Sequence, residues 1–176
     1  KAIRRAPGMP FAYLGRGLSL ARLNRAQRAV RNIEKAMVLA AESGHFENAP
    51  WLAQAAFEGA RAYERLGQRY MALRLYTKAL ESSPENVSTE FLAEALRHRG
   101  RVHLRLKHYQ PALHDLDRAL EADANLAMAY FNRASVYEAQ RHTQAAIEDL
   151  RAFLLLADPE DPHREEAKTR LEMLTG

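Results

Sequence analysis

The chain has 176 residues, of which 47% are hydrophobic and 27% are charged, and these fractions are typical of a folded globular protein. It contains no cysteine, which excludes disulfide bonds, thiol catalysis and cysteine-ligated metal sites. The formal net charge is only +4, but every charged residue before Glu34 is basic. This basic front end could attract acidic proteins, anionic lipid or nucleic acid, while solvated helix faces are the simpler interpretation.

No apolar run approaches the roughly 18 residues that a membrane-spanning helix needs. The N-terminus is charged but lacks the apolar core of a signal peptide. We therefore expect no membrane span, and we favour the cytoplasm as the location.

Taken in chain order, the sequence predicts four pairs of helices and one final helix. In the two clearest pairs the second helices repeat after 34 residues, from Ala112 and Leu116 to Ala146 and Leu150. A period of about 34 is typical of a two-helix solenoid repeat. The predicted repeats are 10–43, 53–86, 93–126 and 127–160, with a basic segment 1–9, inserts 44–52 and 87–92, and a capping helix 161–176.

Each predicted repeat has small residues where its two helices face each other. The eighth position holds Gly17, Ala60, Gly100 and Ala134. The twentieth position is always alanine, and a bulky residue follows at the twenty-fourth, namely Ile33, Tyr76, Leu116 and Leu150. We expect the small residues to let the paired helices approach closely and the bulky residues to fill the space between repeats.

The segments between and after the repeats predict further helix. Residues 87–92 contain good helix formers and no Gly or Pro, so they should lengthen the first helix of the third repeat. Pro50 indicates a helix start, and Trp51 should pack against the end of the preceding helix, with an exposed partner-binding anchor as the alternative. Gly44, Pro84 and Pro159 should end second helices, and Asp161 with Pro162 should begin the capping helix.

These residues resemble the tetratricopeptide repeat (TPR) family over about residues 10–160. The strongest match is Leu96 to Gly100, which Tyr130 to Ala134 repeat, and no repeat has the Trp that the family often places at position four. The resemblance implies an all-α, right-handed α-solenoid of about four helix pairs plus a cap. It also implies that the first helices line a concave groove that binds peptides.

No motif predicts catalysis, a cofactor or a metal site. The seven histidines are scattered, and His98, His103 and His108 are five residues apart, so they do not share one helix face. There is no HExxH motif and no glycine-rich phosphate loop. We therefore expect a protein that is not an enzyme, with no catalytic residue and with histidines at the surface.

The resemblance places a basic, aromatic-flanked surface in the middle of the groove. Its predicted peptide-binding residues are Phe57, Arg61, Arg65, Arg97, Arg101, Arg105, Phe131 and Asn132. Arg97, Arg101 and Arg105 are four residues apart and share a helix face, where guanidinium groups would suit an acidic or C-terminal carboxylate. The equally supported alternative is a solvated face on which Glu94 or Glu64 pairs with the arginines.

Some TPR co-chaperones hold a C-terminal carboxylate with a clamp of lysines and asparagines. Arg97, Arg101 and Asn132 occupy three of the clamp positions, but the last position falls in the capping helix, which offers Glu165 and Glu166. The clamp is incomplete, so the sequence does not predict binding of a chaperone tail.

Three functions remain open from the sequence. The first is a non-enzymatic module that binds a peptide or partner segment, with an acidic segment as the candidate. The second is a structural or oligomerisation scaffold in a larger complex. The third, nucleic-acid binding, is disfavoured by the 22 acidic residues and the few aromatic residues in the groove.

Overall fold

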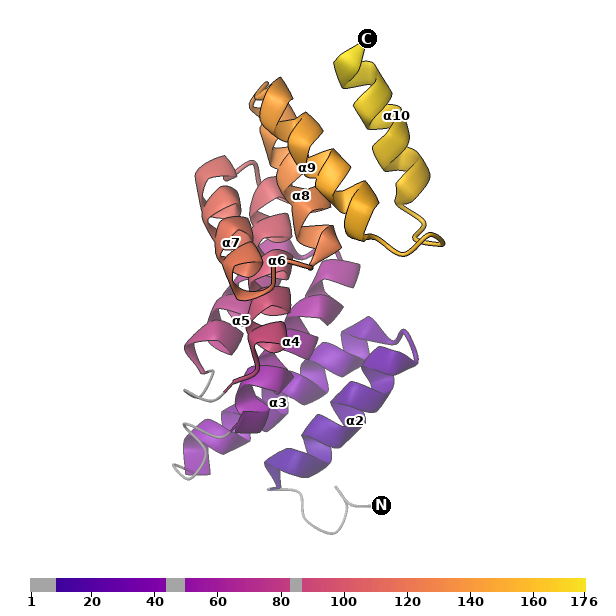
Figure 1. Ribbon diagram of the computed structural model, residues 1–176. Coiled ribbons are helices and arrows are strands. Elements are labelled where there is room, and N and C mark those ends of the chain that lie inside the picture. The colour runs from indigo at the N-terminus through magenta and orange to yellow at the C-terminus, as the bar shows by residue number, and fades with distance from the viewer. Residues whose placement is uncertain (1–8, 44–49, 83–86) are drawn as a thin grey trace. The chain divides into compact units, whose positions relative to one another are not determined.

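The computed structural model describes residues 9–43, 50–82 and 87–176, and the regular secondary structure in these ranges is helical throughout. The all-α prediction is therefore confirmed. Gly44, Pro84 and residues 1–8 of the basic segment lie outside the described residues. The helices are α2 Pro10–Arg22, α3 Ala26–Ser43, α4 Pro50–Arg65, α5 Arg69–Glu81, α6 Thr89–Arg105, α7 Tyr109–Ala122, α8 Ala127–Ala139, α9 Thr143–Leu156 and α10 Arg164–Thr175 (Figure 1).

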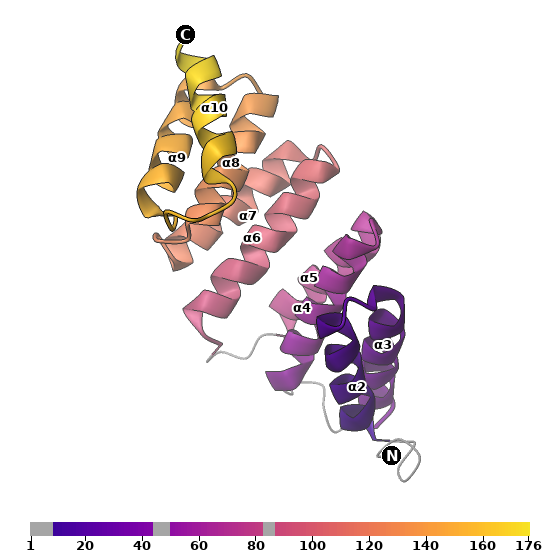
Figure 2. The same ribbon diagram turned by 90° about the vertical axis from the view of Figure 1, so that its right-hand side faces the viewer.

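The chain forms two compact units, Lys1–Val87 and Ser88–Gly176, which we call the first and the second unit. In the first unit α2 packs on α3 and α4 on α5, and α4 also contacts α3 and α2. In the second unit α6 pairs with α7 and α8 with α9, while α10 packs on α9 (Figure 2). The repeat boundaries themselves stay a prediction.

A left-handed residue stands in the tight turn inside every helix pair. Its φ is 56° at Asn24, 70° at Gly67, 61° at Lys107 and 63° at Arg141. These residues are 43, 40 and 34 positions apart, the same spacings as the alanines of the second helices. Glycine and asparagine adopt such a φ at little cost, whereas Lys107 and Arg141 are held in it by the surrounding helices.

The helices of a pair approach as closely as the small residues predict. A Cβ built on Gly17 would lie 2.7 Å from Cγ1 of Ile33, and one on Gly100 would lie 2.9 Å from Cγ of Leu116. Ile33 and Leu116 are themselves fully buried. The predicted role of these small residues is therefore confirmed. The helices could not come this close if a Cβ stood in place of a glycine hydrogen.

Each unit contains a buried cluster of apolar side chains. In the first, Leu14, Ile33, Ala36 and Ala55 form a buried cluster against which Trp51 packs, as predicted, and the Trp51 ring also lies 5.1 Å from that of Phe11. In the second unit a buried cluster joins α8, α9 and α10, and its members are Phe131, Ala134, Leu150, Phe153, Ala157 and Ala167. Ala167 brings α10 onto this cluster, which fits the predicted capping role.

The first residues of α6 and α10 differ in how well the sequence predicts them. Ser88 is the N-cap of α6 and accepts a hydrogen bond from the Phe91 N–H, so helix occupies Thr89 onward in the predicted insert 87–92. The prediction that Asp161 caps the last helix is wrong, because α10 begins at Arg164 with His163 as N-cap. Asp161 instead accepts the His163 backbone N–H at 2.8 Å and closes the turn before the helix.

In three of the helix pairs, an arginine of the first helix forms hydrogen bonds with the second helix. Arg99 donates two hydrogen bonds of 2.7 Å to Asp115, and Arg133 donates two of 2.8 Å to Asp149. At the equivalent place in the first pair, Nε of Arg16 donates to Oδ1 of Asn32 at 2.6 Å. Both aspartates are buried, and the bidentate geometry gives each a charged partner, which a buried carboxylate needs.

Candidate functional site

The predicted arginine ladder lies on α6 of the second unit. Arg97 is only 7% exposed, and its Nε and Nη2 donate to Oε2 of Glu94 at 2.8 and 2.6 Å. Arg101 is half-buried and Arg105 is exposed. The pairing with Glu94 that the sequence offered as an alternative is thus present at Arg97, while Glu64 accepts a hydrogen bond from the Tyr76 hydroxyl at 2.6 Å.

His98 lies between two of these arginines. Its Nε2 is 2.9 Å from Nη2 of Arg97, and its Nδ1 is 3.1 Å from Nη2 of Arg101. A neutral imidazole accepts at one nitrogen only, and a guanidinium donates but never accepts, so at most one of these contacts is a hydrogen bond. The contact that remains places two N–H donors face to face, which an incoming acceptor would relieve.

The expectation that the histidines are surface residues is wrong for His98, which is 9% exposed. It occupies the same helix face as the ladder because it follows Arg97 directly and lies three residues before Arg101. The signal available in the sequence was its place at a groove position of the third repeat. The five-residue spacing of the histidines does not reveal this position.

Asn132 contributes a buried donor from α8, which contacts α6. The residue is 5% exposed, and its Nδ2 has no hydrogen-bond partner among the residues that the structure describes. A buried amide donor without an acceptor costs about 1–3 kcal/mol. Asn132 therefore adds a buried N–H donor on the helix that contacts α6.

Phe131 is a packing residue rather than an exposed flank of the groove. It is 7% exposed, and its ring lies 5.0 Å from that of Phe153. The guanidinium of Arg170, on α10, lies 4.6 Å from the Phe131 ring and donates to Glu138 and Ser135. The capping helix thus covers the part of α8 that carries these three residues.

Phe57 and Arg61 lie in the first unit, on α4. Phe57 is 8% exposed and meets Tyr76 edge-on, with ring centroids 5.7 Å apart. Arg61 lies 5.9 Å above the Phe57 ring and pairs with Glu58 at 3.3 Å. Its side chain is 40% exposed, so this i,i+3 pair contributes little to stability.

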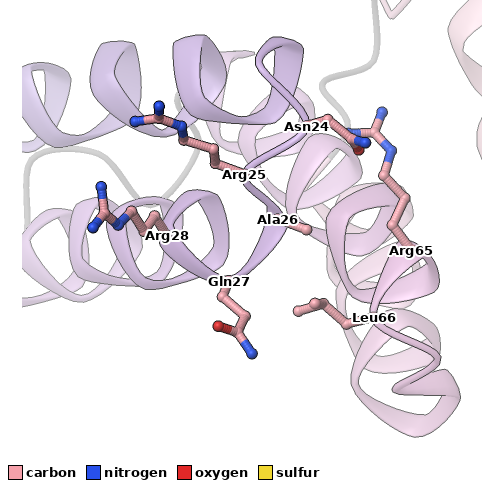
Figure 3. A pocket seen from close by; sticks show the side chains of 7 residues that line it. All are labelled: Asn24, Arg25, Ala26, Gln27, Arg28, Arg65 and Leu66. Atoms are coloured by element: carbon pink, nitrogen blue, oxygen red, sulfur yellow. The ribbon is translucent and has the colours of Figure 1, made fainter.

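Arg65 is exposed at the end of α4, where Nη1 donates to the carbonyl oxygen of Ala21 at 2.9 Å. It borders an open pocket of about 650 Å³ at the α2–α3 turn, lined by Asn24, Arg25, Ala26, Gln27, Arg28, Arg65 and Leu66. Figure 3 shows Arg25 and Arg28 extending together away from α4, while the head of Arg65 lies beside Asn24. The three arginines therefore do not converge on one point in this pocket.

Burial and ion pairing shift several titrations. Burial lowers the pKa of His103, and its Nδ1 has no hydrogen-bond partner in the described part of the chain. The hydrogen bonds that Arg133 donates to Asp149 and Asp117 raise the pKa of Arg133. Burial, followed by the hydrogen bond to Glu34, raises the pKa of Tyr63 to about 12. None of these groups lies among the predicted binding residues.

Residues 9–43, 50–82 and 87–176 contain no cluster of three or more His, Cys, Asp or Glu side chains that could hold a metal ion. Over the same residues, none of the helices combines the length and the apolar character that crossing a membrane requires.

Two family models match the chain, both described as Tetratricopeptide repeat, over residues 53–86 and 100–172. Together with the turns and close helix contacts described above, these matches decide the family. The chain is a tetratricopeptide repeat protein.

The TPR chain resembles parts of longer proteins. It is 30% identical over 90 residues to Sperm-associated antigen 1 of Mus musculus, a match that covers 51% of the chain and 9% of the relative. It is 31% identical over 109 residues to the DnaJ homolog subfamily C member 7 homolog of Schizosaccharomyces pombe. This match covers 62% of the chain and 22% of the relative. The chain therefore spans less than a quarter of these curated relatives.

Solved TPR structures share its fold. YrrB, described as a TPR protein with an unusual peptide-binding site, matches with a TM-score of 0.73 at 22% identity, covering 99% of this chain and 80% of YrrB. The first TPR of Spaghetti (RPAP3) bound to the HSP90 peptide SRMEEVD matches with a TM-score of 0.62 at 22% identity. This match covers 74% of the present chain and 95% of the Spaghetti TPR.

Proposed function

We propose that this TPR chain binds a partner protein through a carboxylate-bearing segment, which contacts the α6 face formed by Arg97, His98 and Arg101 together with Asn132 of α8. We call these four residues the α6–α8 face. The proposed activity is binding, without a chemical step.

One observation carries the proposal: N–H donors are crowded together on this face. His98 faces a guanidinium from each side, at 2.9 and 3.1 Å, and can accept from one of them only. The Nδ2 of Asn132 is buried without an acceptor among the described residues. A carboxylate offers two oxygens with about four acceptor sites, so a single Asp, Glu or C-terminal group could serve several of these donors.

The fold supports the same proposal. YrrB has a peptide-binding site, and the Spaghetti TPR holds the acidic peptide SRMEEVD. The α6–α8 face replaces the lysine and first asparagine of the co-chaperone clamp with arginines, so its preferred sequence should differ from a chaperone tail. Arginine would favour a bidentate, planar contact with a carboxylate where lysine offers a point charge.

A displayed library of random peptides with free C-termini tests this function. We expect selection on the chain to enrich peptides with Asp, Glu or a required terminal carboxylate. The same selection on an Arg97→Gln/Arg101→Gln variant should lose that enrichment, while Arg118→Gln should retain it, since Arg118 is exposed on α7. Enrichment of the same peptides on the double variant, or of none on the chain itself, would refute the proposal.

A further inference from the structure

The first unit has an open pocket between α2 and α3 whose charge is entirely positive. Its volume is about 480 Å³, and it is lined by Tyr13, Arg16, Leu20, Arg28, Arg31, Asn32 and Lys35. In the described part of the chain, no carboxylate lies within ion-pair distance of the four cationic side chains. We call it the α2–α3 pocket. It uses none of the residues of the α6–α8 face.

The second unit contains the same arrangement with its binding partner in place. The guanidinium of Arg16 lies 5.5 Å from the centre of the Tyr13 ring and donates a hydrogen bond to Asn32. In the same way, the guanidinium of Arg133 lies 5.6 Å from the centre of the Tyr130 ring and donates hydrogen bonds to Asp149. The remaining guanidinium nitrogen of Arg133, Nη1, donates to Oδ1 of Asp117 at 2.7 Å.

Asp117 belongs to α7, a helix that packs against α8 from the preceding pair. The equivalent place beside α2 is the α2–α3 pocket. Arg133 thus has two carboxylates, one from its own pair and one from the neighbouring helix. Arg16 has only the neutral amide of Asn32, so its charge is left without compensation among the described residues.

An apolar strip runs beside these charges. Tyr13 and Leu20 line the pocket, and Leu23, one helical turn beyond Leu20, is 67% exposed. Exposed leucine next to a row of cations suits a helix that is apolar on one face and acidic at its edge.

We propose that the α2–α3 pocket docks an acidic amphipathic helix of a partner protein, which lies against α2 as α7 lies against α8 and places a carboxylate on Arg16. Further carboxylates of the same helix would meet Arg28, Arg31 and Lys35. Steric fit comes from Tyr13 and Leu20, while charge sets the register.

The chain's own first eight residues do not fit this role. They carry Lys1, Arg4 and Arg5 and no acidic residue, so they would add positive charge to a pocket that lacks negative charge. Nucleic acid could use the cations but would gain little from Leu20 and Leu23, whereas an amphipathic helix uses both.

The α7 sequence itself supplies the probe. A fluorescein-labelled peptide of residues 109–122, stapled between positions 114 and 118, which are exposed in α7, keeps the face that carries Asp117. We expect saturable binding to the chain by fluorescence anisotropy. An Asp117→Asn peptide should bind about three- to fivefold more weakly, because it loses the ion pair with Arg16, whose gain is partly offset by solvation of an exposed pair.

Variants of the chain locate the binding. Arg16→Gln should weaken binding of the peptide about three- to fivefold, and the charge reversal Arg31→Glu about tenfold. Arg31 is exposed and has no described partner, so its variant stays informative even if Arg16→Gln affects folding. Lys78→Glu, an exposed charge change on α5, is the matched control and should bind as the unaltered chain does.

Several results would overturn the proposal. They are equal affinity of the Asp and Asn peptides, binding unaffected by Arg31→Glu, or no saturable binding at millimolar peptide. Tighter binding of a 20-nucleotide single-stranded RNA, or self-association in sedimentation that Arg31→Glu abolishes, would assign the pocket to another occupant. The Arg97→Gln/Arg101→Gln variant should bind the α7 peptide normally, so failure here is distinguishable from failure of the α6–α8 face.

Discussion

Asp149 and Arg133 hold the fourth helix pair together through two parallel hydrogen bonds of 2.8 Å. The Asp149 side chain is 6% exposed, whereas Asp117, which binds the same arginine, has a side chain that is 49% exposed. One guanidinium thus links a buried carboxylate inside its pair to an exposed one on the neighbouring helix. The two aspartates should differ sharply in what they contribute to stability.

We expect Asp149→Asn to lower the free energy of unfolding of the second unit by about 3 kcal/mol, because it removes the charged partner of a largely buried arginine. Asp117→Asn should cost less than about 1 kcal/mol, since an exposed pair is largely offset by solvation. Urea unfolding followed by circular dichroism measures both. Equal losses for the two variants would contradict this account.

Two glycines on α2 should respond to alanine in opposite ways. A Cβ on Gly15 would have nothing within 4 Å, so Gly15→Ala should raise stability by up to about 1 kcal/mol through helix propensity. A Cβ on Gly17 would lie 2.7 Å from Ile33 Cγ1 and 3.2 Å from the Ile33 backbone nitrogen, so Gly17→Ala should destabilise. Thermal unfolding of both variants checks this, and the same sign for both would be evidence against the close α2–α3 contact.

His103 should make stability depend on pH on the acid side. Burial lowers its pKa in the folded chain below the usual 6.5, against the attraction of Asp115 and with a further contribution from the neighbouring Arg99 and His108. The unfolded chain therefore binds the proton more readily, so this contribution to stability is complete above pH 6.5 and is lost as the pH falls through the folded pKa.

The matched variant is His103→Gln, which should flatten the stability profile between pH 7.5 and 5. Urea midpoints at several pH values give the slope for each protein. An unchanged slope in the variant would mean that His103 is not the group responsible.

The contribution of Tyr63 to the stability of the fold should decrease at alkaline pH. Its hydroxyl donates to Oε1 of Glu34 at 2.7 Å, and its pKa is raised from 10.0 to about 12. Because the folded state favours the protonated phenol, its contribution is complete below pH 10 and is lost as the pH rises through about 12. Absorbance at alkaline pH should show one late-titrating tyrosine fewer in Tyr63→Phe than in the natural chain. A late phase of unchanged amplitude in the variant would exclude this role for Tyr63.

The recurring features of the fold could be predicted from the sequence because they depend on local sterics. Gly17 and Gly100 precede bulky residues at a fixed distance along the chain, and the clash that a side chain would cause is visible in that spacing. The helix starts were less predictable: Asp161 and Pro162 form a favourable start signal, but the chain uses Asp161 to close a turn instead.

The candidate site was only partly predictable, because the repeat pattern gives the helix face but not the partners across it. The pattern placed Arg97 and Asn132 at groove positions. It did not show that Arg170 of the capping helix lies over Phe131, or that His98 lies between two guanidinium groups. Both contacts depend on side-chain directions that follow from packing in three dimensions.

The central claim is that donors on the α6–α8 face take a carboxylate from a partner. Its most direct test is calorimetric titration of a library-selected peptide into the chain, with the same peptide carrying Asn and Gln in place of Asp and Glu and an amidated C-terminus as the control. We predict that neutralising the peptide, or Arg97→Gln/Arg101→Gln in the chain, weakens binding at least tenfold, with Arg118→Gln unchanged. Equal affinity of the charged and neutral peptides for the natural chain would contradict the account.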